Sequence, residues 1–191
     1  MSLGGPVPNR VRESKVIARV WFMDVDGVIA PFGKGGAFRD WVRSPHEVYE
    51  LWLSPTQAGL IRGVLERTGT ELVWVTTWAH HAAEYVEGFL GWPTHRFAPL
   101  PHPDIKGASI DPATGCWWKL DAVERFLDEL QPDRFVWSDD DLSRHRPEVL
   151  QALSRYDASG LLQAPRPYVG LSERWLREAE DHLTGGEPSV S

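Results

Sequence analysis

The fold is decided by the stretch VIARVWFM at residues 16–23 and the DVDGV that follows it at residues 24–28. The first part is short, apolar and rich in β-branched and aromatic side chains, which is typical of a strand buried on both faces of a sheet. The second part ends that strand in a polar turn. Similar apolar runs occur at residues 72–76 and 135–138, with a weaker run at 161–163. The sequence therefore predicts several short, buried strands.

Helical patterns fall between these strands. Ser54 and Pro55 are typical of an N-cap and a first helical residue, and Thr68-Gly69 ends the same pattern. Further helices are predicted at residues 79–90, 117–130, 147–156 and 172–183. Because strands that alternate with helices of this length form crossover units, we predict a three-layer α/β/α sandwich with a parallel, Rossmann-like sheet.

The chain divides into one predicted domain and two flanking segments. Residues 1–14 and 184–191 lack apolar periodicity, so we predict a flexible N-terminal arm and a flexible tail. Residues 15–183 contain no linker and are predicted to form a single domain. Within it, the Gly-rich and basic stretch Pro31–Ser44 precedes a strand expected at Val48–Leu53, which together predict a small flap hairpin. Residues 91–115 are predicted to form a long loop that is either functional or packed by its own side chains.

Composition and charge exclude several classes of protein. The 191 residues are 42% hydrophobic and carry a formal net charge of -7, which argues against a general attraction to nucleic acid or anionic lipid. No apolar run reaches the roughly 18 residues of a membrane span, and no signal peptide is recognisable, so a cytoplasmic location is expected. A single cysteine, Cys116, excludes an intramolecular disulfide framework and a Cys-rich zinc site.

Polar residues follow each predicted strand at the point where a parallel sheet binds its ligands. They are Asp24 and Asp26 after the first strand, Thr76 and Thr77 after the second, and Asp139, Asp140 and Asp141 after the third. Lys119 stands near the start of a predicted helix, four residues before Val123 and therefore on the inward face. These side chains are expected to converge at one edge of the sheet.

The chemistry of this set points to a phosphate ester. Side chains two positions apart in an extended segment point to the same side, so Asp24 and Asp26 can both face one phosphorus atom. One carboxylate can be the nucleophile and the other the proton donor. Several aspartates repel a phosphate unless a cation intervenes, and oxygen ligands select a hard ion such as Mg²⁺.

These motifs, in this order, resemble the haloacid dehalogenase (HAD) superfamily over about residues 16 to 165. The resemblance rests on DVDGV at 24–28, a strand ending at Thr76, then Lys119, then FVWSDD at 135–140. The stretch LVWVTTW at 72–78 and the later Val169-Gly170-Leu171 also resemble the HAD domains associated with Swiss Army Knife RNA-repair proteins.

The resemblance implies a Mg²⁺-dependent phosphatase, a phosphoric monoester hydrolase that works through an aspartyl-phosphate. It implies that Asp24 is the nucleophile and Asp26 the general acid and base, with Thr76 and Lys119 stabilising the phosphoryl group. It also implies that Mg²⁺ is held by the carboxylates matching Asp24 and Asp139 and by the backbone carbonyl matching Asp26. We include Asp140 in the predicted metal site.

The residues themselves leave alternatives open. Thr77 competes with Thr76, Lys106 competes with Lys119, and the first metal carboxylate could be any member of Asp139–Asp141. Asp26-Gly27 could be a plain turn after a strand. A phosphotransferase would use the same groups with another acceptor. A catalytically idle HAD-like module that binds a partner would have the same fold, although all four motif positions being chemically intact argues against it.

The size of the substrate is predicted from a missing element. The intervals from Asp26 to Thr76 and from Thr76 to Lys119 are too short to hold a separate cap domain, which small-substrate enzymes of this superfamily use to enclose their substrate. We therefore expect a large phosphorylated substrate, such as a nucleic-acid end or a phosphoprotein. The predicted substrate-binding residues are Lys34, Arg39, Trp41 and Arg43 of the flap, together with Thr77. The oligomeric state is left open.

Overall fold

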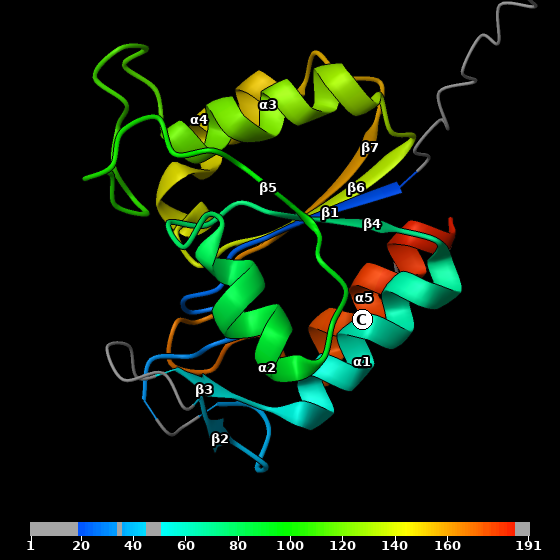
Figure 1. Cartoon of the computed structure of the whole chain (residues 1–191). Helices are drawn as coiled ribbons and strands as arrows, with labels where there is room; N and C mark the ends of the chain where they lie inside the picture. Colours follow the sequence, from blue (N-terminus) through cyan, green and yellow to red (C-terminus); the bar gives the residue numbers. More distant parts are fainter. Residues whose placement is uncertain (1–18, 34–35, 45–50, 186–191) are drawn as a thin grey trace, which may run out of the picture.

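A computed structural model describes residues 19–33, 36–44 and 51–185 of the chain. They form a five-stranded parallel sheet with helices on both faces and a separate two-stranded hairpin (Figure 1). The sheet has the order β5-β4-β1-β6-β7. Its strands are β1 (Arg19–Met23), β4 (Glu71–Trp74), β5 (Arg96–Phe97), β6 (Arg134–Ser138) and β7 (Ser159–Gln163).

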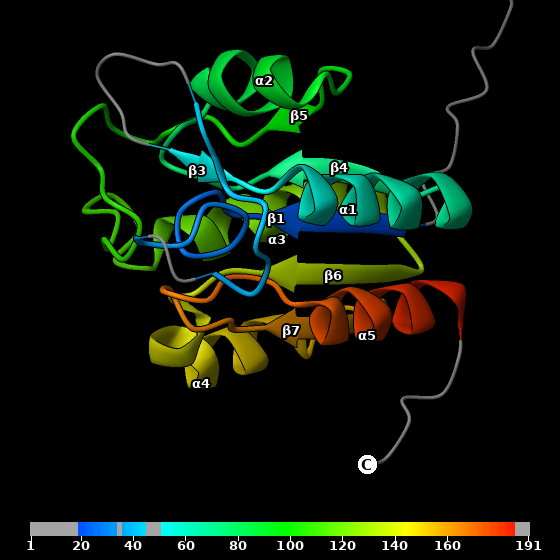
Figure 2. The same ribbon diagram turned by 90° about the horizontal axis from the view of Figure 1, so that it is seen from below.

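The helices form two layers, one on each face of the sheet. One layer holds α1 (Pro55–Thr68), α5 (Glu173–Thr184) and the π-helix η1 (Ala83–Glu87), which continues into α2 (Gly88–Leu90). The other layer holds α3 (Trp118–Leu130) and α4 (Leu142–Leu153). Figure 2 shows α1 and α5 in front of the strands and α3 behind them.

Strand β1 lies in the middle of the sheet and is buried on both of its faces. Trp21 and Met23 pack into the core under α1 and α5, whereas Val20 and Phe22 pack into the core under α3. This alternation follows from the two-residue period of a strand. The predicted three-layer sandwich with a parallel sheet is confirmed.

Helix α1 has the predicted limits, but the start of α4 was predicted wrongly. Ser54 caps α1, since its Oγ accepts a hydrogen bond from the backbone N–H of Gln57 at 3.1 Å. Helix α4 begins at Leu142 instead of at Pro147, which lies inside the helix. A proline in a helix removes one backbone hydrogen bond. The burial of Leu142 and Val149 against the core favours the longer helix all the same.

The segment between β4 and α3 contains the other departures from the predicted elements. The helix predicted at residues 79–90 is present from His81, where two α-helical residues lead into η1 and α2, whereas Ala79 and His80 form a turn. Strand β5 was not predicted, because its two residues are both exposed and carry no apolar pattern. It forms by pairing with β4, where Ala98 N–H also donates to Trp74 O at 2.7 Å.

The predicted flap hairpin is present as β2 (Val42–Arg43) paired with β3 (Trp52–Leu53). Residues 48–50 of the predicted strand lie outside the described residues. It is attached to α1 through Asp40, whose Oδ2 accepts a hydrogen bond from Thr56 N–H at 2.8 Å. The predicted arm and most of the predicted tail lie outside the described residues. No helix in the described part of the chain is long and apolar enough to cross a membrane.

Candidate active site

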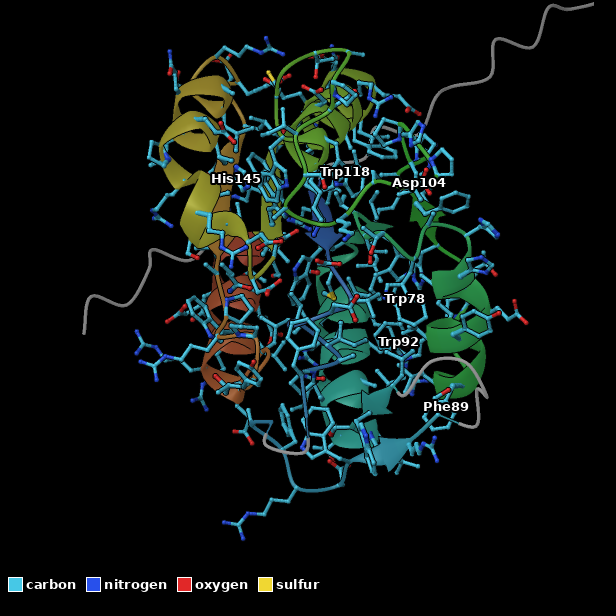
Figure 3. All side chains as sticks on the ribbon, turned by 90° about the vertical axis from the view of Figure 1, so that its left-hand side faces the viewer. Trp78, Phe89, Trp92, Asp104, Trp118 and His145 are labelled. Atoms are coloured by element: carbon cyan, nitrogen blue, oxygen red, sulfur yellow. The ribbon has the colours of Figure 1, made fainter. Side chains whose placement is uncertain are left out.

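The carboxyl ends of β1 and β6 lie side by side and bring Asp24 and Asp139 together. The two strands pair in parallel, and Asp24 N–H donates to Ser138 O at 3.0 Å. On the other side of β6, Asp139 N–H donates to Gln163 O at 3.0 Å. Both aspartate side chains are buried. Figure 3 looks onto this edge of the sheet.

Asp140 joins these two residues in an acidic cluster. Carboxylate oxygens of Asp24, Asp139 and Asp140 all lie within 4.8 Å of one another. Gly27 makes room for Asp140, because a Cβ at position 27 would lie 2.6 Å from its Cγ. Gly27 also has a φ of +69°, which favours glycine. The DVDG turn therefore provides carboxylates and also the space in which Asp140 approaches them.

Lys119 is the cation of the cluster. It is fully buried near the start of α3, and its Nζ donates to Asp24 Oδ2 and, at 2.7 Å, to Asp139 Oδ2. Although burial disfavours its charge, the carboxylates of Asp139 and Asp24 raise the pKa of Lys119. Lys106 is exposed, and its backbone O accepts a hydrogen bond from Trp118 Nε1 at 3.0 Å. Of the two competing lysines, Lys119 is the one that the structure places among the carboxylates.

Burial and mutual repulsion make Asp139 and Asp140 weaker acids than usual. Burial, and then the charge of Asp24, raise the pKa of Asp140 to about 6. Burial also raises the pKa of Asp139, against the opposing effect of Lys119. Asp141 lies outside the acidic cluster and is partly exposed, with its Oδ1 3.1 Å from Arg144 Nη1. It occupies the N-cap position of α4.

Asp26 lies beside this cluster and is held by Trp78. Trp78 Nε1 donates to Asp26 Oδ2 at 2.9 Å. Burial, and then the charge of Asp24, raise the pKa of Asp26 to about 6. Sequence reasoning missed Trp78, although a tryptophan directly after the two threonines at a strand end was a usable signal.

The two threonines take different places. Thr76 is fully buried beyond the end of β4, and its Oγ1 accepts a hydrogen bond from Trp78 N–H at 3.4 Å. Thr77 is half-buried in the turn that follows. The structure thus places Thr76 in the interior of this edge, and the choice between the two for the substrate stays a prediction.

The predicted flap residues are not part of the acidic cluster. Lys34 lies outside the described residues. Arg39 and Arg43 are exposed on the flap. Trp41 is half-buried and donates from Nε1 to Phe38 O at 2.5 Å, within the flap itself. Their contact with a substrate therefore stays a prediction.

The long loop predicted at residues 91–115 packs against the cluster. A Cβ at Gly107 would lie 3.2 Å from Asp141 Oδ2 and 3.6 Å from Lys119 Nζ. Trp117, next to α3, fixes this part of the loop by donating from Nε1 to Gly107 O at 2.7 Å. The loop therefore packs directly against Lys119 at Gly107.

The acidic cluster has the donor set of a site for a hard divalent cation. Its three carboxylates supply only oxygen, which Mg²⁺ prefers. Asp24, Asp139 and Asp140 are the residues that would hold the ion. One lysine does not offset three carboxylates, so a divalent cation fits the charge of the cluster as well as its donor atoms.

Comparison with known proteins shows the family of the chain. A sequence model of the HAD domain in Swiss Army Knife RNA repair proteins matches residues 20–175. No curated protein sequence matches the chain. A solved structure described as a HAD superfamily (subfamily III A) hydrolase from Legionella pneumophila is similar at a TM-score of 0.43 and 20% identity, over 90% of this chain and 84% of that one. Because the family match spans most of the sequence, the chain belongs to the HAD domains of the Swiss Army Knife RNA repair type.

Proposed function

We propose that the protein is a Mg²⁺-dependent phosphatase that forms a phosphorylated Asp24. The observation that carries this proposal is that Asp24 is bonded to the buried Lys119 and lies near Asp26, whose pKa is raised by burial and then by the charge of Asp24. Lys119 holds Asp24 Oδ2, and Val25 N–H donates to its Oδ1 at 2.6 Å. Asp24 is thus held in one orientation, as a nucleophile in a displacement must be.

The reaction proceeds in two displacements at phosphorus. Asp24 attacks the phosphorus, the bond to the leaving alcohol breaks, and Asp26 donates its proton to the leaving oxygen. Asp26 then accepts a proton from water, whose oxygen attacks the same phosphorus and releases inorganic phosphate and free Asp24. A carboxyl with a pKa of about 6 can serve both steps near neutral pH.

Two groups offset the negative charge that collects at this site. Lys119 carries a full positive charge within hydrogen-bonding distance of two of the carboxylates. Mg²⁺ held by Asp24, Asp139 and Asp140 would neutralise charge on the phosphoryl oxygens. We also propose the backbone carbonyl of Asp26 as a ligand and Thr76 as a hydrogen-bond donor to the phosphoryl group.

The open edge of the sheet supports a large substrate. In the described residues, Asp26 and Thr76 are separated by the flap hairpin and α1, and Thr76 and Lys119 by η1, α2, β5 and loops. None of these is a folded cap domain that could enclose a small molecule. The family's association with RNA repair agrees with the end of a nucleic acid, and a phosphoprotein is the other large candidate.

Purified protein tests the proposal. With Mg²⁺ it should hydrolyse a generic aryl phosphate, and a chelator should abolish the activity. A panel of sugar phosphates, mononucleotides, phosphorylated oligonucleotides and phosphopeptides then ranks the substrates by kcat/KM. Activity that persists in chelator would contradict the metal dependence, and a kcat/KM that is highest for a small sugar phosphate would contradict the large substrate.

A further inference from the structure

A row of rings leads from Asp26 across the open edge of the sheet. Trp78, which bonds Asp26, lies edge-on to Tyr85 at 6.1 Å between ring centroids. Tyr85 stacks on His81 at 5.4 Å with an angle of 15° between the planes, and His81 lies 4.0 Å from His80. Trp78 and Tyr85 are half-buried, whereas both histidines are exposed. We call these four residues the ring strip.

The backbone under the ring strip is strained and firmly anchored. Ala79 has a φ of +44°, a left-handed conformation that costs energy in a residue other than glycine and is often found at functional sites. Tyr85 lies in η1, and π-helical turns are also frequent at such sites. At the end of η1, Glu87 Oε1 accepts a hydrogen bond from Trp74 Nε1 of β4 at 2.6 Å. The rings are therefore held in place by the fold.

The direction of the ring strip indicates which part of a substrate it meets. This step rests on the proposed function, in which Asp26 protonates the leaving oxygen. The leaving group must therefore lie on the Asp26 side of the phosphorus, and that is the side on which Trp78 begins the row. Figure 3 shows Trp78 on the face of the molecule that looks out from this edge of the sheet. A leaving group that extends away from phosphorus reaches Tyr85 and His81 next.

Exposed flat rings bind flat ligands, because offset stacking removes two apolar faces from water. The stacked pair of Tyr85 and His81 lies one ring beyond Trp78, not at Asp26 itself. In an aryl phosphate the ring carries the leaving oxygen directly and would have to lie against Asp26. In a nucleotide a sugar separates the leaving oxygen from the base, which matches the offset of the stacked pair.

We propose that the ring strip binds the base of a nucleoside leaving group by stacking on Tyr85 and His81. Binding to protein that carries Asp24→Asn tests this without turnover. In Mg²⁺, calorimetric titration compares AMP with ribose 5-phosphate, which has the same phosphate and sugar but no base. AMP should bind roughly tenfold more tightly, as expected for one stacked base.

Variants in the same Asp24→Asn background locate the effect. Tyr85→Leu and His81→Ala should each bring the ratio of the two dissociation constants close to one. Tyr156→Leu is the matched control, because Tyr156 lies after α4, where its hydroxyl contacts Glu124 O of α3, and not in the ring strip. It should keep the parent ratio. Thermal unfolding shows whether each variant is folded.

Three results would overturn the proposal. They are equal affinity for AMP and ribose 5-phosphate in the parent, equal losses for both ligands in the ring-strip variants, and tighter binding of phenyl phosphate than of AMP. The last would assign an aryl leaving group instead, as in a phosphotyrosine peptide. Turnover by the wild type distinguishes a failure of the ring-strip proposal from a failure of the proposed function. A preference for AMP in binding with no hydrolysis of any substrate would refute the phosphatase and keep the ring strip.

Discussion

Buried carboxylates lie in two regions of the structure, and the groups that surround them differ. Glu87 lies in η1, and its Oε1 accepts from Trp74 Nε1 at 2.6 Å and from His95 N–H at 3.0 Å. His95 Nδ1 lies 2.7 Å from the same oxygen. At the end of β1, by contrast, Asp24 and Asp139 share a single lysine and face a third carboxylate.

The difference separates a carboxylate that holds the fold from the carboxylates to which the proposed function assigns the chemistry. Glu87 links β4, η1 and the segment before β5, and its donors come from neighbouring elements of one layer. The acidic cluster places like charges together in a buried site, which costs stability. Burial, and then the charge of Asp24, raises the pKa of Asp140, and burial raises the pKa of Asp139. Groups with shifted pKa values are frequent at functional sites. Variants in each region should therefore separate activity from stability.

The largest effect on turnover is expected for Asp24→Asn. The variant keeps the shape of the side chain but removes the proposed bond-forming oxygen, so kcat should fall by several orders of magnitude. Asp133→Asn is the control, since Asp133 is an exposed aspartate just before β6, at the opposite end of the sheet. Steady-state kinetics on an aryl phosphate measures both. Comparable kcat values for Asp24→Asn and the wild type would end the nucleophile assignment.

Lys119→Met should have the next largest effect, and it should act on activity and stability together. Loss of the buried cation removes stabilisation of the phosphoryl group, for which a fall in kcat of about 10²- to 10³-fold is expected. It also leaves Asp24 and Asp139 without their counter-charge, at a cost of about 3–5 kcal/mol in the free energy of unfolding. Kinetics and chemical denaturation measure the two effects.

Lys106→Met is the matched control, because Lys106 competed with Lys119 in the sequence. Its side chain is exposed, and the contact that it makes with Trp118 uses the backbone O, which the substitution keeps. Lys106→Met should change neither kcat nor the free energy of unfolding noticeably. A larger loss of kcat in Lys106→Met than in Lys119→Met would show that the loop, and not α3, provides the active-site lysine.

The third prediction concerns the metal and separates adjacent aspartates. Asp139→Asn should raise the Mg²⁺ concentration for half-maximal activity more than about tenfold, since a direct ligand is lost. Asp141→Asn should raise it little, because Asp141 is outside the acidic cluster and lies near Arg144. Activity measured against Mg²⁺ concentration gives both values. The reverse order would place the metal ligand two residues further along the chain.

The sequence predicted those parts of the molecule whose signals are local. The apolar run before Asp24 and the Ser54 cap correspond to β1 and α1 because burial and capping act over a few neighbouring residues. The convergence of Asp24, Asp139 and Lys119 was also predictable, since the carboxyl ends of parallel strands meet at one edge. Which of Asp139, Asp140 and Asp141 lie in the acidic cluster could be established only from the structure.

What escaped prediction depends on contacts between distant segments. Strand β5 has two exposed residues and forms only because β4 offers a free edge. The bond from Trp78 to Asp26 joins residues that are far apart in the sequence, and the left-handed Ala79 that accompanies it breaks a local preference. Such breaks are expected where a fold serves a site instead of its own stability.

The smallest effect on turnover, and a clear effect on stability, is expected for Glu87→Met. Methionine fills a similar volume but accepts no strong hydrogen bond, so Trp74 Nε1 and His95 N–H lose their buried acceptor. Each unsatisfied donor costs about 1–3 kcal/mol, and the melting temperature should fall by several degrees. Glu87→Gln keeps an amide oxygen for these donors and should be milder. Glu84→Gln, an exposed site on the same helix, is the control.

Activity per folded molecule decides whether the two regions are separate. Hydrolysis of ribose 5-phosphate, which has no base to stack on the ring strip, should change little in Glu87→Met at a temperature where the variant is folded. The reason is that Glu87 Oε1 bonds Trp74 and His95, which are not residues of the acidic cluster. If kcat for this substrate falls as far as in Lys119→Met while the fold is intact, then Glu87 contributes to turnover and the two regions are not separate.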